Sequence, residues 1–176
     1  GGPMAHQVQP DSYMEINNFY TLTVYEKGAE IVRMYHSLLG PETYRQATDL
    51  YFDRHDGQAV TIEEFVSAME DASGRDLTQF RRWYKQAGTP VVTVRSQYDA
   101  EAKTYTLDFE QSCPATPGQT DKLPLVIPIK LGLVGADGAD MPLNSAGQTE
   151  TVFEMTEASQ RLVIENINQE PVPSLL

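Results

Sequence analysis

Residues 80–97, FRRWYKQAGTPVVTVRSQ, contain the boundary between two kinds of sequence. Before Gly88 the apolar residues recur every three or four positions, as on one face of an amphipathic helix. After Thr89 and Pro90 they recur at every second position, as in a strand with one buried face. Helical patterns followed by strand patterns, without alternation, are typical of an α+β chain or of two consecutive domains.

The sequence before this boundary has the start and stop signals of four short helices. Thr23 with Glu26, and Thr61 with Glu64, have the spacing of capping boxes, in which each pair satisfies free backbone N–H groups at a helix start. Pro41 suits the first turn of a helix because its missing N–H is not needed there. The predicted helices start and end at Thr23 and Gly40, Pro41 and Gly57, Thr61 and Gly74, and Asp76 and Gly88.

The sequence after the boundary predicts five or six short strands with turn residues between them. The clearest lie at residues 91–97, 104–110, 125–133, 149–155 and 160–165. Pro128 falls inside the third of these runs, which predicts an edge or a bulge at that point because proline cannot donate to a ladder. A hairpin turn is expected at residues 136–138. The pattern suits a small antiparallel β-sandwich.

Composition excludes several classes of function. The chain has 176 residues with 13 Lys and Arg against 25 Asp and Glu, a net charge of −12. This balance argues against binding to nucleic acid or to an anionic membrane, both of which attract basic surfaces. No run of 18 apolar residues is present, so no membrane span is expected. The single cysteine, Cys113, excludes an intrachain disulfide framework.

Metal sites are not predicted from the residues present. The three histidines lack the His-Glu-x-x-His spacing that places two zinc ligands on one helix face. The segment around Gly57 resembles half of a calcium-binding loop, but Phe52 and Arg54 would occupy positions that need oxygen ligands. A glycine helix end followed by the Thr61 cap explains the same residues.

Tyr25 is the one residue for which the sequence leaves a chemical role open. It falls in the first turn of the helix predicted from Thr23. A phenol keeps its proton near neutral pH, and there it could donate a hydrogen bond to a developing oxyanion. The alternative is that the ring packs beside Val24, and the residues alone favour this alternative.

The chain resembles the M1 (gluzincin) family of zinc aminopeptidases, in particular its bacterial alanyl-aminopeptidase-like branch. The resemblance covers nearly the whole chain and is strongest in residues 3–92. The segments that carry it are residues 3–6 (PMAH), 15–34 (EINNFYTLTVYEKGAEIVRM), 51–57 (YFDRHDG), 80–84 (FRRWY), 87–90 (AGTP) and 171–176 (PVPSLL).

The resemblance implies a zinc-dependent exopeptidase that removes N-terminal amino acids from peptides. The tyrosine of the family's Tyr-Glu-Lys-Gly motif, which donates to the tetrahedral oxyanion, corresponds to Tyr25. By the same analogy Tyr20 lines the pocket for the first side chain of the substrate, with Asn17 close by. The resemblance also implies a cytoplasmic location.

The chain lacks the family's zinc-binding motif, so we expect it to be a fragment without activity of its own. Residues 1–88 would be the helical end of a thermolysin-like catalytic domain, and residues 89–176 an Ig-like β-sandwich domain. Zinc would be bound only in the intact enzyme, by residues before Gly1, and the expected partners are peptide substrates and the remaining domains. Such a fragment would self-associate through uncovered apolar faces. The alternative is a stand-alone protein-interaction module.

Overall fold

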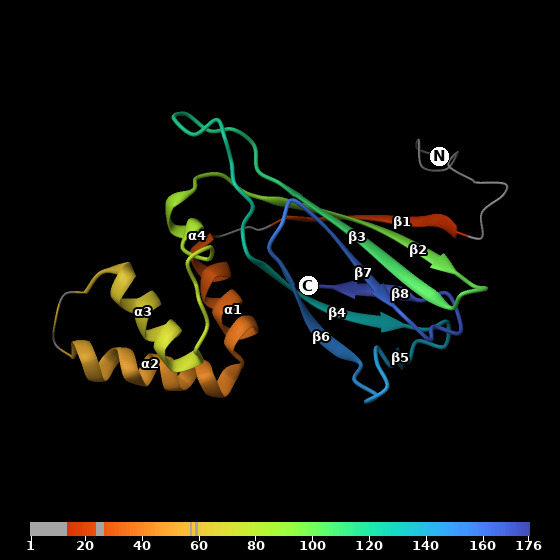
Figure 1. Ribbon diagram of the computed structural model, residues 1–176, viewed down its shortest axis with the longest axis horizontal. Coiled ribbons are helices and arrows are strands. Elements are labelled where there is room, and N and C mark those ends of the chain that lie inside the picture. Colours follow the sequence, from red (N-terminus) through yellow and green to blue (C-terminus); the bar gives the residue numbers. More distant parts are fainter. Residues whose placement is uncertain (1–13, 24–26, 57, 59) are drawn as a thin grey trace.

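The computed structural model describes residues 14–23, 27–56, 58 and 60–176, in which helices pack at one end of a β-sandwich (Figure 1). This arrangement confirms the α+β class. Its helices are α1 (Lys27–Leu39), α2 (Pro41–His55), α3 (Ile62–Ser73) and α4 (Arg82–Lys85). Its strands are β1 (Met14–Thr23), β2 (Val91–Asp99), β3 (Thr104–Ser112), β4 (Ile127–Val134), β5 (Asp140–Met141), β6 (Glu150–Met155), β7 (Ser159–Ile164) and β8 (Val172–Leu175).

The sandwich consists of two antiparallel sheets. One has the strand order β1-β2-β3-β7, and in the other β4 pairs with β5, β6 and β8. Alternation along β4 sends Ile127, Ile129, Leu131 and Leu133 into the space between the sheets, where each is at most 5 % exposed. Leucine and isoleucine at every second position therefore bury one face of the strand, as the sequence pattern predicts.

Three of the predicted helix boundaries are confirmed: the start and end of α3 and the start of α2. The Thr61 hydroxyl accepts from the Glu64 N–H, and the Glu64 carboxylate accepts from the Thr61 N–H, which completes the capping box of α3. Gly74 ends α3 with a φ of 71°, a left-handed conformation that suits glycine. Pro41 is the first residue of α2.

The expected helix start at Thr23 stays a prediction, because residues 24–26 lie outside the described residues. Thr23 is the last residue of strand β1, where it pairs with Val91, and helix α1 begins at Lys27. Strand β1 lies at the edge of the sandwich sheet and extends along β2 from Met14 to Thr23 (Figure 1). The sequence did not predict strand β1, although its segment is rich in β-branched and aromatic residues, because its partner strand lies far away in sequence.

The fourth predicted helix is much shorter than expected. Asp76 accepts a hydrogen bond from the Thr78 N–H, but α4 covers only Arg82–Lys85. The intervening backbone forms bonds between residues three apart, such as Trp83 N–H to Phe80 C=O, which produce a tighter turn. Phe80 and Trp83 of this segment are nevertheless buried.

The position of Pro128 is consistent with its lack of a backbone N–H donor. Pro128 pairs with Glu154 of β6 on one side, while β8 pairs with Leu131–Val134 on the other side of β4. Pro128 therefore lies beyond the end of β8, at a locally open edge. Strand β8 itself was not predicted, because its four residues include a proline and offer little alternation.

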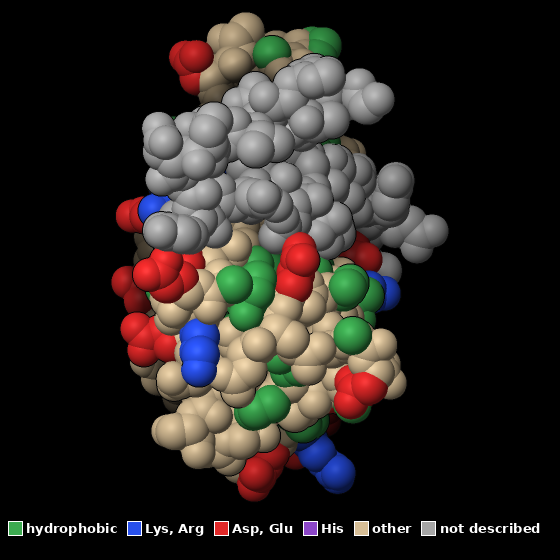
Figure 2. Space-filling model, turned by 90° about the vertical axis from the view of Figure 1, so that its right-hand side faces the viewer, with side chains coloured by type: hydrophobic (Ala, Val, Ile, Leu, Met, Phe, Trp, Pro, Cys, Tyr) green, Lys and Arg blue, Asp and Glu red, His purple; other side chains and the backbone are tan. Residues whose placement is uncertain are grey.

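The described part of the sandwich end remote from the helices carries more acidic than basic side chains (Figure 2). Figure 2 shows acidic, basic and hydrophobic side chains interspersed over the described part of this face. Among the described helices, none combines the length and apolar character that a membrane crossing requires.

Candidate active site

The three predicted site residues occupy the segment that runs into helix α1. Asn17 falls at a bulge in β1, between the pairs Ile16–Gln97 and Asn18–Ser96. Tyr20 pairs with Val94 of β2. Tyr25 lies outside the described residues. Asn17 and Tyr20 therefore lie on the same strand. In sequence, Tyr25 is two residues before the first residue of α1.

Helix α1 is anchored by a hydrogen bond between a buried tyrosine, Tyr35, and a half-buried one, Tyr84. The Tyr35 hydroxyl lies 2.8 Å from the Tyr84 hydroxyl, and the two residues form a hydrogen bond across 49 positions of sequence. The Tyr35 ring is fully buried and packs on Phe80, with 4.6 Å between ring centroids, and edge-on against Phe65 at 5.6 Å. Burial is the main reason why the pKa values of both tyrosines are raised, so both keep their protons through neutral pH.

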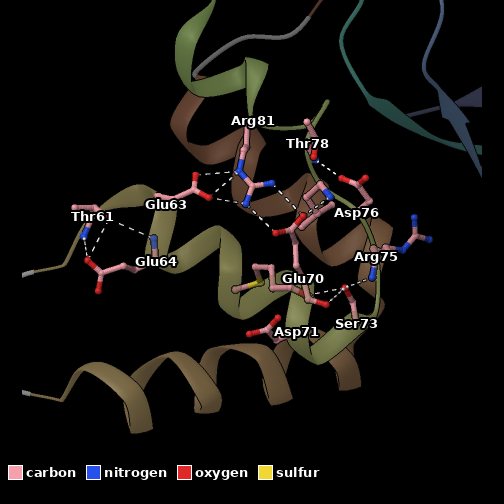
Figure 3. A network of polar contacts seen from close by, with 12 residues as sticks. Thr61, Glu63, Glu64, Glu70, Asp71, Ser73, Arg75, Asp76, Thr78 and Arg81 are labelled. Carbon is pink, nitrogen blue, oxygen red and sulfur yellow. Dashed lines mark hydrogen bonds and ion pairs between the residues drawn. The ribbon is translucent and has the colours of Figure 1, made fainter.

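Arg81 joins the turn before α4 to helix α3 through two carboxylates (Figure 3). Its guanidinium donates to Glu63 at 2.7–3.1 Å and to Glu70 at 2.8 and 3.0 Å. Glu70 also accepts from the Leu77 N–H at 2.8 Å. Hydrogen bonds from Arg81 are the main reason why the pKa values of Glu63 and Glu70 lie below the ordinary range. The cluster holds α3 to the 77–81 turn.

These lowered pKa values predict a loss of stability in acid. A carboxylate whose folded-state pKa is depressed stabilises the fold above its unfolded value of about 4.3, and this stabilisation disappears as the pH falls through the folded value. We expect the free energy of unfolding to decrease as the pH is lowered below about 4.5. In Glu70→Gln this decrease should be less steep. Urea unfolding between pH 7 and pH 3, followed by fluorescence of Trp83, the only tryptophan, measures the effect.

The control for this experiment is Glu101→Gln, at an exposed turn residue whose backbone N–H bonds to Asp99. It should leave the pH dependence as it is in the unchanged chain. Identical slopes for Glu70→Gln and the unchanged chain would show that the Arg81 cluster does not contribute to acid stability.

A row of polar contacts joins the end of the helical part to the sandwich. The Trp83 indole N–H donates to the Val126 carbonyl at 2.7 Å, in a buried position. The Gln79 amide donates to the Thr156 carbonyl at 2.6 Å, and Arg75 pairs with Glu154 of β6 at 2.7 Å. The helices and the sandwich are therefore attached by directional bonds as well as by apolar packing.

His36, His55 and Cys113 have structural contacts, whereas His6 lies outside the described residues. His36 stacks on Tyr44, His55 Nδ1 lies 3.0 Å from Glu64 Oε2, and Cys113 Sγ donates to the Ala87 carbonyl at 3.6 Å. In the part of the chain that the structure describes, no three His, Cys, Asp or Glu side chains come together as a metal-binding group. The described residues therefore do not fit a catalytic zinc ion.

Sequence reasoning missed the Tyr35–Tyr84 pair and the Arg81 cluster. Tyr35 follows the apolar stripe of α1, so its pattern predicts burial but not a polar partner. Arg81 is one of two consecutive arginines, a pattern that does not indicate a carboxylate partner. Neither signal identifies a partner elsewhere in the sequence.

Comparison with known proteins divides the chain between two family models. Residues 2–84 match the peptidase family M1 domain, and residues 88–176 match a domain of unknown function, DUF3458, with an Ig-like fold. Aminopeptidase N of Escherichia coli (strain K12) is 52% identical over 175 residues, which are 99% of this chain and 20% of that protein. Aminopeptidase N of Haemophilus influenzae is 45% identical over 99% of this chain and 20% of its own length.

A solved structure shares the fold. The crystal structure of Legionella pneumophila aminopeptidase A in complex with aspartic acid aligns with a TM-score of 0.69 and 29% identity, over 86% of this chain and 16% of that one. The chain spans about a fifth of the length of the Escherichia coli and Haemophilus influenzae proteins. The chain belongs to the M1 peptidase family, with sequence from its peptidase domain followed by the Ig-like DUF3458 domain.

Proposed function

We propose that this chain contributes one wall of the active site, and the Ig-like domain behind it, to an aminopeptidase that removes N-terminal amino acids from peptides. The observation that carries the proposal is the 52% identity to Escherichia coli aminopeptidase N over 175 residues. The proposed partners are peptide substrates and the other domains of a longer polypeptide. The proposed location is the cytoplasm, by analogy with the bacterial branch of the family.

Tyr25 is the proposed oxyanion donor. A tyrosine phenol has an ordinary pKa of about 10 and is therefore protonated at neutral pH. When the carbonyl carbon of the substrate becomes tetrahedral, its oxygen gains negative charge, and a phenol aimed at that oxygen stabilises the charge. The donor acts mainly in the transition state, so it lowers the barrier rather than strengthening substrate binding.

Tyr20 and Asn17 are the proposed substrate-binding residues. Their place in β1, paired along β2, supports this role because a strand fixed in register holds the positions of its residues closely. Tyr20 would contact the first side chain of the peptide, and Asn17 would lie beside it. The proposal predicts that changes at Tyr20 alter KM and the preference for substrate side chains.

In M1 peptidases zinc supplies an activated water and polarises the scissile carbonyl. We propose that the zinc ligands are supplied by sequence outside these 176 residues, because the chain has no His-Glu-x-x-His motif. No step at the metal is assigned to residues of this chain. Its own contribution is the phenol donor, the binding strand and the domain that supports them.

The experiment is a chimera in which these 176 residues replace the matching segment of Escherichia coli aminopeptidase N. Alanyl p-nitroanilide is the substrate, and the unmodified enzyme and the isolated 176-residue chain with added zinc are measured beside it. We expect the chimera to hydrolyse the substrate at a rate comparable to that of the unmodified enzyme, and the isolated chain to show none above buffer.

Two results would contradict the proposal. The first is a chimera that folds and retains zinc but does not hydrolyse the substrate. The second is turnover by the isolated chain that zinc stimulates, which would place a complete active site within the 176 residues.

A further inference from the structure

The junction between the two family domains (residues 85–88) is in contact with one loop of the Ig-like domain. This loop, the strap (residues 113–124), leads from the end of β3 toward β4 and lies beside α4 (Figure 1). Its tip is a tight turn, closed by backbone hydrogen bonds of 3.1 and 2.9 Å between Thr116 and Gln119. Gly118 in this turn has a φ of 77°, which suits glycine at the third position. The strap therefore has a defined shape of its own.

Two glutamine side chains join the strap to the backbone of the junction. Gln119 Oε1 accepts from the Ala87 N–H at 2.7 Å, and Gln119 Nε2 donates to the Lys85 carbonyl at 2.9 Å. Gln86, a residue of the junction, makes the same kind of contact with the strap. Its Nε2 donates to the Leu123 carbonyl at 3.1 Å, and its Oε1 accepts from the Leu123 N–H at 2.9 Å. Each amide side chain thus replaces a backbone partner, and the two segments are paired in both directions.

Lys122 connects the turn of the strap to the junction. An ammonium group has three N–H donors, and this one meets three neutral acceptors. It donates to the Thr116 hydroxyl at 2.6 Å and to Gln119 Oε1 at 3.1 Å, both within the strap. It also donates to the Ala87 carbonyl at 2.7 Å, in the junction. Hydrogen bonds from a charged donor are stronger than neutral ones, so this side chain is a firm connection between the two segments.

Gly88 allows the strap to lie directly on the junction. Its φ is 98°, and a Cβ atom at this position would lie 2.9 Å from Cys113 Sγ and 3.4 Å from the Pro114 carbonyl oxygen. The Cys113 thiol also donates to the Ala87 carbonyl at 3.6 Å. Only a residue without a side chain fits this approach. A freely moving linker makes few contacts and leaves its backbone groups to water, whereas this junction bonds to the strap.

We propose that the strap makes the junction a rigid joint rather than a hinge, and that Lys122 and Gln119 hold this joint closed. The strap belongs to the Ig-like domain, and the junction directly follows α4, so the joint connects the two family domains. A rotation of the Ig-like domain about residues 85–88 then requires the strap to open first. This role is independent of the proposed activity, because it involves none of the proposed site residues.

Amide hydrogen exchange of the 176-residue chain, followed for single residues by NMR, tests the joint. The Ala87 N–H exchanges when the joint opens locally, whereas the Trp83 indole N–H reports the contact of the helices with Val126. We expect Lys122→Met to make exchange at Ala87 about tenfold faster, because the bonds that it removes come from a charged donor. Exchange of the Trp83 indole should stay as in the unchanged chain. The matched control is Lys130→Met, at an exposed lysine of β4, which should change neither rate.

Two results with Lys122→Met would overturn the rigid joint. The first is exchange at Ala87 that is no faster than in the unchanged chain or in Lys130→Met. The second is an equal acceleration at Ala87 and at the Trp83 indole, because this would reflect a loss of overall stability rather than the opening of one joint.

A double-mutant cycle with Gln119→Ala tests whether the two residues act together. Gln119→Ala removes the acceptor of the Ala87 N–H and should also make its exchange faster. Since Lys122 donates to the same Gln119 oxygen, we expect the double variant to exchange at Ala87 less rapidly than the product of the two single effects predicts. Effects that multiply exactly would show two independent contacts, and would overturn their joint role in holding the strap closed.

Discussion

Replacement of Tyr25 by Phe in the chimera is expected to lower kcat by about 10²–10³-fold, the loss typical of a single oxyanion donor. The change removes one hydroxyl and leaves the ring. Because the ground-state carbonyl carries little charge, the lost hydrogen bond matters mainly in the transition state, and KM should change little. Initial rates over a range of alanyl p-nitroanilide concentrations give the two constants separately.

Two controls make this result specific. Zinc content by atomic absorption should be equal in the two proteins, which separates the loss of a donor from the loss of metal. Tyr98→Phe should have the rate of the unchanged chimera, since its hydroxyl is used within the sandwich. A loss confined to KM would contradict the assigned role and indicate a substrate-binding residue instead.

The parts of the fold that follow from neighbouring residues were predictable. The Thr61 and Glu64 capping box involves residues three apart, so its pattern contains all the information needed. The alternation of apolar residues along β4 likewise predicts which of its side chains are buried. Strand β1, which ends at Thr23, was not predicted, because it pairs with β2 nearly 70 residues away and no local pattern contains that partner.

The candidate site shows the same division. The residues alone leave two roles open for Tyr25, packing of its ring or donation to an oxyanion. Only the resemblance to a family favours the catalytic role. The Tyr35–Tyr84 bond and the Trp83–Val126 bond connect positions 49 and 43 apart, respectively. A sequence predicts that such aromatic residues are buried, whereas the choice of a polar partner depends on how the helices and the sandwich meet.

The largest loss of stability is expected from Trp83→Ala, by about 3–5 kcal/mol. The side chain is 1% exposed and belongs to the core that the helical part shares with the sandwich. Its removal leaves a cavity and leaves the Val126 carbonyl, which now accepts the indole N–H, without that partner. Domains of this size are stable by only about 5–15 kcal/mol, so much of the total is lost.

Urea unfolding of the 176-residue chain, followed by circular dichroism because the variant has no tryptophan, measures this loss. Trp83→Phe should cost less, since it keeps an aromatic ring and loses chiefly the hydrogen bond, about 1–3 kcal/mol. Phe52→Ala is the matched control: this ring is 64% exposed on α2, and its loss should change stability by about 0.5 kcal/mol or less. If Trp83→Ala cost no more than Phe52→Ala, the contact between Trp83 and Val126 could not be what joins the helices to the sandwich.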